Sequence, residues 1–163
     1  MCNDRAATVA FTGHRTYDGS CDEALRSVVR YLHGRGFRTF ITGMAVGFDL
    51  SAGECAASLR GELEGLRLVC AVPFAGQERR FPDEERLRYM RLLSAADDVV
   101  VLAERYSPAA YRMRNDFLVD NASLVVTYYD GTRGGTSYTV HRAVQQRLPV
   151  VNLWSGLFDG ERM

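Results

Sequence analysis

Residues 130–137 combine a glycine-rich turn, hydroxyl groups and an arginine. An apolar run typical of a β-strand precedes them, and a run with helical spacing follows. Gly134 and Gly135 allow several backbone N–H groups to point in one direction at the start of that helix, where the helix dipole is positive. Thr136 adds a hydroxyl donor, and Arg133 adds a fixed positive charge. The pattern predicts a phosphate-binding loop; the alternative is a plain turn in which Thr136 caps the helix.

Two more loops carry candidate ligand-binding residues, and each follows an apolar run. With the first loop, they contribute Gly13, His14, Arg15, Gly43, Met44, Gly47, Asp49, Arg133, Gly134, Gly135 and Thr136. A further polar loop at residues 74–80 carries Arg79 and Arg80. Because the carboxyl ends of parallel strands meet at one edge of a sheet, all four loops are expected to converge there. Such convergence favours a phosphate-bearing ligand over four unrelated turns.

The expected roles of these residues differ. Arg15 is a candidate phosphate clamp, and its alternative is a surface arginine. His14 is a candidate phosphate donor or acid–base group, and its alternative is a capping or surface residue. Gly43 and Gly47 are expected to shape a second wall of the site, although both could serve only a turn. Asp49 is expected to cap the helix that follows it, with a ribose contact as the alternative.

A second arginine candidate precedes the fifth strand. Arg112 and Arg114 lie two residues apart on a predicted helix, so they do not share a face. One is expected to point to the site and the other to solvent. Asn115 lies beside them and could bond a base, ribose or phosphate.

The scaffold that must position these residues is predicted to consist of alternating strands and helices. Strands are predicted at residues 8–11, 37–42, 66–72, 98–102, 124–129 and 149–153, and the longer intervening helices include residues 49–63 and 111–121. Several strands are continuously apolar, which indicates burial on both faces. The sequence therefore predicts an α/β fold with a doubly wound, mostly parallel sheet of about six strands and helices on both faces.

Composition limits the function. The 163 residues are expected to form a single domain, with a core at about residues 8–153 and a tail at 154–163. The net charge is zero and every basic residue is arginine, which excludes lysine-dependent chemistry and a global field for polyanions. No apolar run is long enough to span a membrane. The four scattered cysteines are typical of a cytoplasmic protein, and no cluster has metal-ligand spacing.

The motifs at residues 11–15, 41–49, 114–115 and 134–136 resemble, in order and spacing, the YpsA-like family of the SLOG superfamily. That superfamily includes the DNA-processing protein DprA and the LOG-type, lysine decarboxylase-like phosphoribohydrolases. The resemblance covers about residues 8–153. It implies a Rossmann-like fold, a cytoplasmic bacterial protein, a homodimer, and a nucleotide or nucleotide-derived ligand.

Three functions follow from the resemblance. The favoured hypothesis is binding of a small-molecule nucleotide, such as a mononucleotide, ADP-ribose or an NAD-like dinucleotide, for sensing or regulation and with no cofactor required. A second hypothesis is DprA-like binding of single-stranded DNA, a nucleic-acid partner that a neutral chain favours less. A third is LOG-like hydrolysis of a nucleoside 5′-monophosphate. In that family's motif a catalytic glutamate stands three residues after the threonine, where this chain has Thr139.

Overall fold

A computed structural model describes residues 4–155 and contains a six-stranded sheet in which every pair of neighbours is parallel. The strands are β1 (Thr8–Gly13), β2 (Thr39–Thr42), β3 (Arg67–Val72), β4 (Asp98–Val101), β5 (Leu124–Tyr128) and β6 (Val150–Asn152). Their order across the sheet is β4-β3-β2-β1-β5-β6. The predicted doubly wound α/β fold is therefore confirmed.

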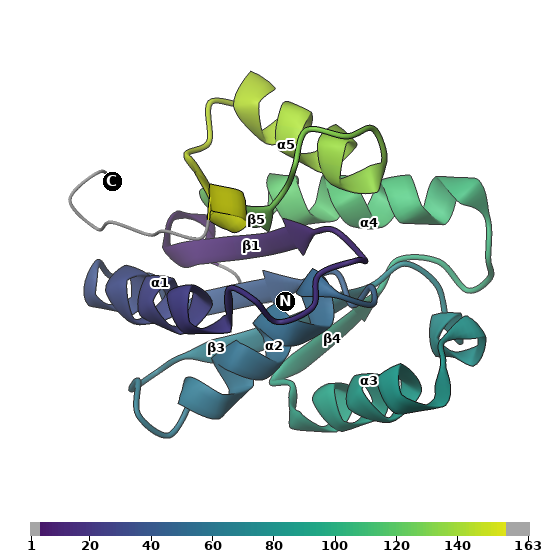
Figure 1. Ribbon diagram of the computed structural model, residues 1–163, viewed down its shortest axis with the longest axis horizontal. Coiled ribbons are helices and arrows are strands. Elements are labelled where there is room, and N and C mark those ends of the chain that lie inside the picture. The colour runs from purple at the N-terminus through teal and green to yellow at the C-terminus, as the bar shows by residue number, and fades with distance from the viewer. Residues whose placement is uncertain (1–3, 156–163) are drawn as a thin grey trace.

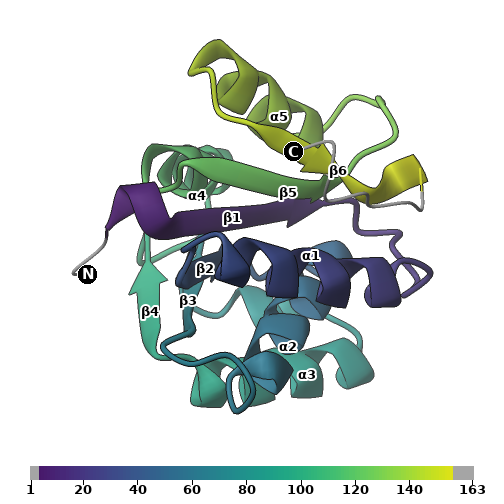
Figure 2. The same ribbon diagram turned by 90° about the vertical axis from the view of Figure 1, so that its left-hand side faces the viewer.

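Five α-helices cover the two faces of this sheet in the described residues (Figures 1 and 2). They are α1 (Asp22–Gly34), α2 (Phe48–Leu59), α3 (Asp83–Ala95), α4 (Pro108–Asp120) and α5 (Gly135–Gln145). Side chains of α1, α2 and α3 belong to one buried cluster, and side chains of α4 and α5 belong to another. The sheet separates the two clusters, as a strand pattern buried on both faces requires.

Strand β1 shows how the sequence produces these two layers. Val9 and Phe11 lie in the first cluster, and Ala10 between them lies in the second. All three are fully buried, because successive side chains of a strand point to opposite faces and helices cover both. Ala10 pairs in register with Ile41 of β2 and Val125 of β5, which places small and branched side chains beneath α4 and α5.

The order of the strands creates a switch point between β1 and β5. The chain runs outward from β1 through β2, β3 and β4, and then returns to place β5 on the other side of β1. The loops that follow β1 and β5 therefore leave the sheet in diverging directions and open a crevice at its carboxyl edge. Candidate residues 13–15 and 130–136 lie in these two loops.

Several element boundaries differ from the predicted ones. Helix α2 ends at Leu59 rather than residue 63, and the following turn contains Gly61 and Gly65, the latter with φ +77°. Helix α4 begins at Pro108 rather than residue 111, because the Ser107 side chain accepts a hydrogen bond from the Ala110 amide and caps it. Residues 156–163 of the predicted tail lie outside the described residues.

Candidate functional site

A cavity of about 650 Å³ occupies the carboxyl edge of the sheet beside the switch point. Its walls come from the loops after β1, β2 and β5 and from the side of α4. It is lined by Thr12, Gly13, His14, Arg15, Thr16, Ala45, Asp49, Tyr111, Arg114, Asn115, Asp130, Thr132, Arg133, Gly134, Gly135 and Thr136. A cavity of this size is large enough for a nucleotide-sized molecule.

The N-terminus of α5 forms one end of the cavity. Gly134 is its N-cap, with φ +149°, and Gly135 is its first residue. No side chain caps the helix and its first turn contains no acidic residue, so the alternative in which Thr136 is the cap is wrong. Gly134 and Gly135 are exposed. Helix amides and the positive end of the helix dipole therefore face the cavity, and no acidic side chain in the first turn of α5 neutralises them.

Arg15 and Arg133 add positive charge to the cavity: Arg133 directly precedes the N-cap of α5, and Arg15 interacts electrostatically with Asp49 and Arg114. Both side chains line the cavity and both residues are exposed. Within residues 4–155 neither forms an ion pair or a side-chain hydrogen bond. By contrast, Arg30, Arg88 and Arg142 are each paired with a carboxylate. The two cavity arginines are thus available for an anionic ligand.

Arg114 and Asn115 form the buried side of the cavity, and each is 6% exposed. Arg114 Nε donates to Asn115 Oδ1 at 2.7 Å, and Nη1 donates to the Gly43 carbonyl. Burial lowers the pKa of Arg114, while Asp49 opposes that effect. A Cβ placed on Gly135 would lie 3.6 Å from Asn115 Nδ2, so the Asn115 amide lies next to the start of α5. Arg112, as expected, is exposed and lies over the Tyr138 ring.

Asp49 is a buried carboxylate in the cavity wall, with only 3% of its surface exposed. The expectation that it caps α2 is wrong, because the N-cap is Gly47 and Asp49 lies inside the first turn. Its Oδ2 accepts a hydrogen bond from the Ala45 amide at 3.3 Å, whereas its Oδ1 has no partner. Burial raises the pKa of Asp49 to about 6, although Arg114 and the amides of Ala45 and Gly13 oppose the rise.

The loop after β2 contributes Ala45 and Asp49 to the cavity lining, and Gly43, Met44 and Gly47 lie outside it. Gly47 has φ +82°, and a Cβ there would lie 2.5 Å from the Arg15 carbonyl oxygen. A Cβ on Gly43 would lie 2.8 Å from Asp49 Oδ2. These two glycines therefore let the backbone approach other groups of the protein, and they do not approach the cavity as expected.

This loop is held in a constrained shape by side-chain contacts. Met44 is fully buried and has φ +63°, an uncommon conformation for a residue other than glycine. The buried Gln77 donates from Nε2 to the Met44 carbonyl at 3.1 Å. With the Arg114 bond to Gly43, two successive carbonyls are anchored away from the cavity.

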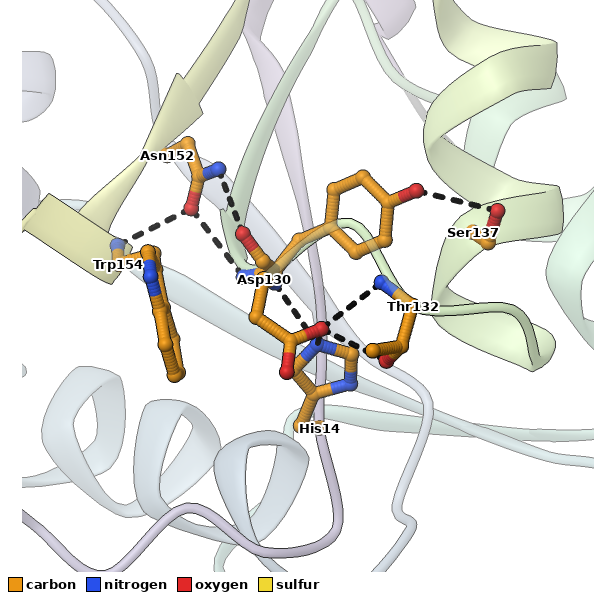
Figure 3. Close-up of polar contacts among 7 residues, drawn as sticks. His14, Asp130, Thr132, Ser137, Asn152 and Trp154 are labelled. Atoms are coloured by element: carbon orange, nitrogen blue, oxygen red, sulfur yellow. Dashed lines mark hydrogen bonds and ion pairs between the residues drawn. The ribbon is translucent and has the colours of Figure 1, made fainter.

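His14 and Asp130 join the loops after β1 and β5. His14 Nε2 lies 2.7 Å from Asp130 Oδ1 and 2.9 Å from the Asp130 amide nitrogen (Figure 3). Asp130 Oδ1 also accepts hydrogen bonds from the Thr132 amide and hydroxyl, which lower the pKa of the carboxylate most, followed by His14. Before any ligand binds, His14 therefore organises the loop, a contact that local sequence could not reveal.

Asn152 holds the other side of this loop. Its Oδ1 accepts from the Tyr129 and Trp154 amides, and its Nδ2 donates to the Tyr129 carbonyl at 2.8 Å (Figure 3). The side chain extends the pairing of β5 and β6 beyond the end of the strands. No local pattern indicates this contact, because residue 152 lies far from residue 129 along the chain.

Sequence reasoning missed several lining residues, namely Thr12, Thr16, Ala45, Tyr111, Asp130 and Thr132 as binding positions. Tyr111 is one of these lining residues. Its position in the first turn of α4 brings it to the cavity, and its ring centroid lies 5.9 Å from the Arg114 guanidinium. One feature of the sequence did point to this position. Residues 107–111 follow the predicted strand at 98–102, which places them near the carboxyl ends of the strands.

The loop at residues 74–80 lies at the same edge but lines a separate groove of about 300 Å³. Arg80 lies over the Tyr106 ring at 4.6 Å from its centroid. Phe74 packs edge-on against both Tyr106 and Tyr111, at 5.4 and 5.6 Å between centroids. An aromatic cluster therefore connects this groove to the main cavity.

The carboxylates that line the cavity are Asp49 and Asp130, and the expected catalytic position is Thr139 instead. Thr139 is fully buried, and its hydroxyl donates to the Gly135 carbonyl at 2.9 Å rather than entering the cavity. Glu54 pairs with Arg88 outside the cavity. Within the described residues, no three His, Cys, Asp or Glu side chains are grouped to hold a metal ion. No helix among residues 4–155 has the length and apolar character needed to cross a membrane.

The fold and the cavity define a Rossmann-like α/β protein with an anion-accepting cleft at its switch point. A family model described as the YspA SLOG family, YpsA, matches residues 9–150, and the chain belongs to this family. YoqJ, an uncharacterised protein from the SPbeta prophage of Bacillus subtilis, is 29% identical over 109 residues. The match covers 60% of this chain and 64% of YoqJ, so the chain spans just under two thirds of that relative.

Two solved structures share the fold. DNA processing protein A from Helicobacter pylori, described for its single-stranded DNA binding mode, has a TM-score of 0.67 and 16% identity. The match covers 91% of this chain and 65% of that protein. The molybdenum cofactor carrier protein from Chlamydomonas reinhardtii has a TM-score of 0.55 and 16% identity, over 91% of this chain and 76% of the other.

Proposed function

We propose that this protein binds a nucleotide or nucleotide-derived ligand, such as a mononucleotide, ADP-ribose or an NAD-like molecule, in the cavity at the switch point. The observation that carries the proposal is the uncapped N-terminus of α5 facing the same cavity as Arg15 and Arg133, which form no ion pair or side-chain hydrogen bond within residues 4–155. Helix amides and unpaired guanidinium groups together suit a phosphate.

The rest of the cavity fits the remainder of such a ligand. Tyr111 offers an aromatic face for a base, and Asn115 offers an amide beside the start of α5. Arg114 keeps its third guanidinium nitrogen free of hydrogen-bond partners among the described residues. Because Thr139 supplies no carboxylate, a sensing or regulatory role fits better than LOG-like hydrolysis.

A second candidate function is binding of single-stranded DNA. The related fold of the Helicobacter pylori protein and the adjoining groove support it, since the groove holds Arg79, Arg80 and Tyr106 next to the cavity. Stacking aromatics with arginines along one path are typical of single-strand binding. The zero net charge favours the small ligand.

Isothermal titration calorimetry with AMP, ADP-ribose, NAD and a short single-stranded DNA tests both candidates. A small-ligand site predicts saturable binding that Arg15→Ala and Arg133→Ala each weaken, while Arg35→Ala, an exposed arginine outside the cavity lining, leaves it unchanged. Binding only to DNA, with a steep salt dependence, would support the second candidate. No binding of any nucleotide would reject the first.

The homodimer and the cytoplasmic location remain predictions from the family resemblance. Light scattering after size-exclusion chromatography measures the first directly, with and without the best ligand from the titrations.

A further inference from the structure

Asp49 Oδ1 is an unused hydrogen-bond acceptor in the wall of the cavity. The residue is 3% exposed, and Oδ1 has no partner while Oδ2 is held by the Ala45 amide. A buried carboxylate oxygen without a hydrogen bond is unfavourable, since it has lost its water, and the nearby amides and guanidinium groups offset only part of that cost. The cavity is therefore incomplete at this point in the absence of a hydrogen-bond donor.

A short series of contacts fixes where Asp49 lies relative to the anion end. Asn115 lies next to the start of α5, because a Cβ placed on Gly135 would lie 3.6 Å from Asn115 Nδ2. Arg114 lies next to Asn115, because its Nε donates to Asn115 Oδ1 at 2.7 Å. A Cβ on Gly43 would lie 3.1 Å from Arg114 Nη1 and 2.8 Å from Asp49 Oδ2. Asp49 is thus separated from the phosphate end by two neighbouring side chains.

The two sides of the cavity offer a ligand different groups. The start of α5 and Arg133 offer donors and positive charge that attract a phosphate, whereas Asp49 Oδ1 offers an acceptor that needs a hydrogen-bond donor. The phosphate then lies at α5, and the group that follows it along the ligand reaches Asp49. In a nucleoside 5′-phosphate, that next group is the ribose.

We infer that Asp49 accepts a hydrogen bond from a ribose hydroxyl, so the cavity selects ribonucleotides over deoxyribonucleotides. This inference rests on the proposed nucleotide-binding function. A deoxy ligand leaves the acceptor unsatisfied, and a site built to bond a hydroxyl strongly rejects the analogue that lacks it. The same reasoning makes the main cavity a poor site for DNA.

Calorimetry on the unmodified protein tests the inference with AMP, 2′-deoxy-AMP and 3′-deoxy-AMP. Removal of the hydroxyl that contacts Asp49 should weaken binding by about tenfold or more. IMP serves as a second arm, because it changes the exocyclic group of the base and keeps the sugar. Equal affinity for AMP and both deoxy forms overturns the inference and leaves the proposed function intact. Discrimination against IMP alone overturns it in favour of a base contact, and failure of all four ligands to bind rejects both.

Two variants separate the sugar contact from the phosphate contact. Asp49→Asn should reduce the preference for AMP over the discriminated deoxy form, because an amide replaces the charged acceptor. Arg133→Ala should weaken both ligands alike and keep their ratio, because Arg133 adjoins the start of α5 and acts on the phosphate. Retention of the full preference in Asp49→Asn overturns the inference; if this variant does not fold, the ligand series on the unmodified protein decides alone.

Discussion

His14 Nε2, at the end of β1, lies 2.7 Å from Asp130 Oδ1, at the end of β5. The two strands flank the switch point, so this contact joins both sides of the cleft. The same nitrogen lies 2.9 Å from the Asp130 amide nitrogen. Nε2 accepts from that amide when it carries no proton, and it donates to the carboxylate when it carries one.

We expect His14→Ala to release the Asp130 amide. Amide hydrogen exchange at Asp130 and Thr132, followed by NMR, should quicken in this variant, and nucleotide affinity should fall several-fold because the loop is less ordered. His33→Ala, at the end of α1 away from the cleft, is the matched control and should change neither quantity. Unchanged exchange in His14→Ala would mean that Thr132 alone holds the loop.

Arg114→Met should lower the free energy of unfolding by about 2 kcal/mol or more, because the buried Gly43 carbonyl loses its donor. Arg114→Lys should recover little, since an ammonium cannot reproduce the fork that contacts Gly43 and Asn115. Arg112→Ala, two residues away and exposed, should change the free energy by less than about 0.5 kcal/mol. Urea denaturation measures all three, and equal effects of the Arg112 and Arg114 changes would contradict this account.

Asp49 should make stability fall with pH. Its pKa rises from 3.8 to about 6 in the folded protein, so the folded state holds a proton more tightly than the unfolded chain does. The stability from this proton is fully present below about pH 4 and is lost as the pH rises through about 6. The charged groups that face Asp49, Arg114 and Arg15, keep their charge over this range.

The variant Asp49→Asn should therefore match the unmodified protein near pH 4 and exceed its free energy of unfolding by about 3 kcal/mol at pH 8. Urea denaturation at several pH values measures the difference. Asp18→Asn is the control: its carboxylate is exposed and its pKa lies below the ordinary value, so the change should give no gain at high pH. If the free energies of unfolding of Asp49→Asn and the unmodified protein differed by the same amount at every pH, Asp49 would not be the source of the pH dependence.

Gly135→Asp should abolish nucleotide binding without unfolding the protein. A carboxylate at the first residue of α5 is favourable with the helix dipole, by about 0.3–1 kcal/mol, and it places a negative charge where the phosphate is expected. Gly135→Ala adds only a Cβ at an ordinary 3.6 Å from Asn115 Nδ2, so its affinity should change little. Calorimetry with the best ligand compares them, and binding by the aspartate variant would place the phosphate elsewhere.

Gly47→Ala should be among the most destabilising glycine changes in the chain. Its φ is +82°, and the new Cβ would lie 2.5 Å from the Arg15 carbonyl oxygen, which is backbone. Gly36→Ala shares a positive φ, +103°, but its Cβ would meet nothing within 4 Å. Thermal unfolding should separate the steric cost in Gly47→Ala from the conformational cost of about 1 kcal/mol that both share.

Much of the fold followed from local patterns. Apolar runs such as the one at β5 indicated strands buried on both faces, and the alternation with helices indicated a parallel sheet. The convergence of the loops after β1 and β5 then followed from topology, since parallel strands end at one edge. The start of α5 was predicted for the same reason, because Gly134 and Gly135 stand directly between a strand and a helix.

The site itself was only partly predictable. The glycines at 43 and 47 were assigned to a ligand wall, yet the space beside them is filled by Asp49, Arg114 and the Arg15 backbone. Glycine spacing indicates where backbones approach something closely, and it does not say whether that neighbour is a ligand or the protein. Asn152 acts through Tyr129, which lies far from it along the chain, and no local pattern identifies that contact.

The sequence by itself determined the order of strands and helices, the glycine turns and the places where arginines leave the sheet, because these depend on backbone conformation and short-range periodicity. Only the tertiary structure decided that Arg15 and Arg133 stay unpaired, that His14 holds Asp130, and that Asp49 is buried with a free oxygen. Pairing and burial depend on groups distant in sequence that packing brings together, and they determine which charges remain available to a ligand.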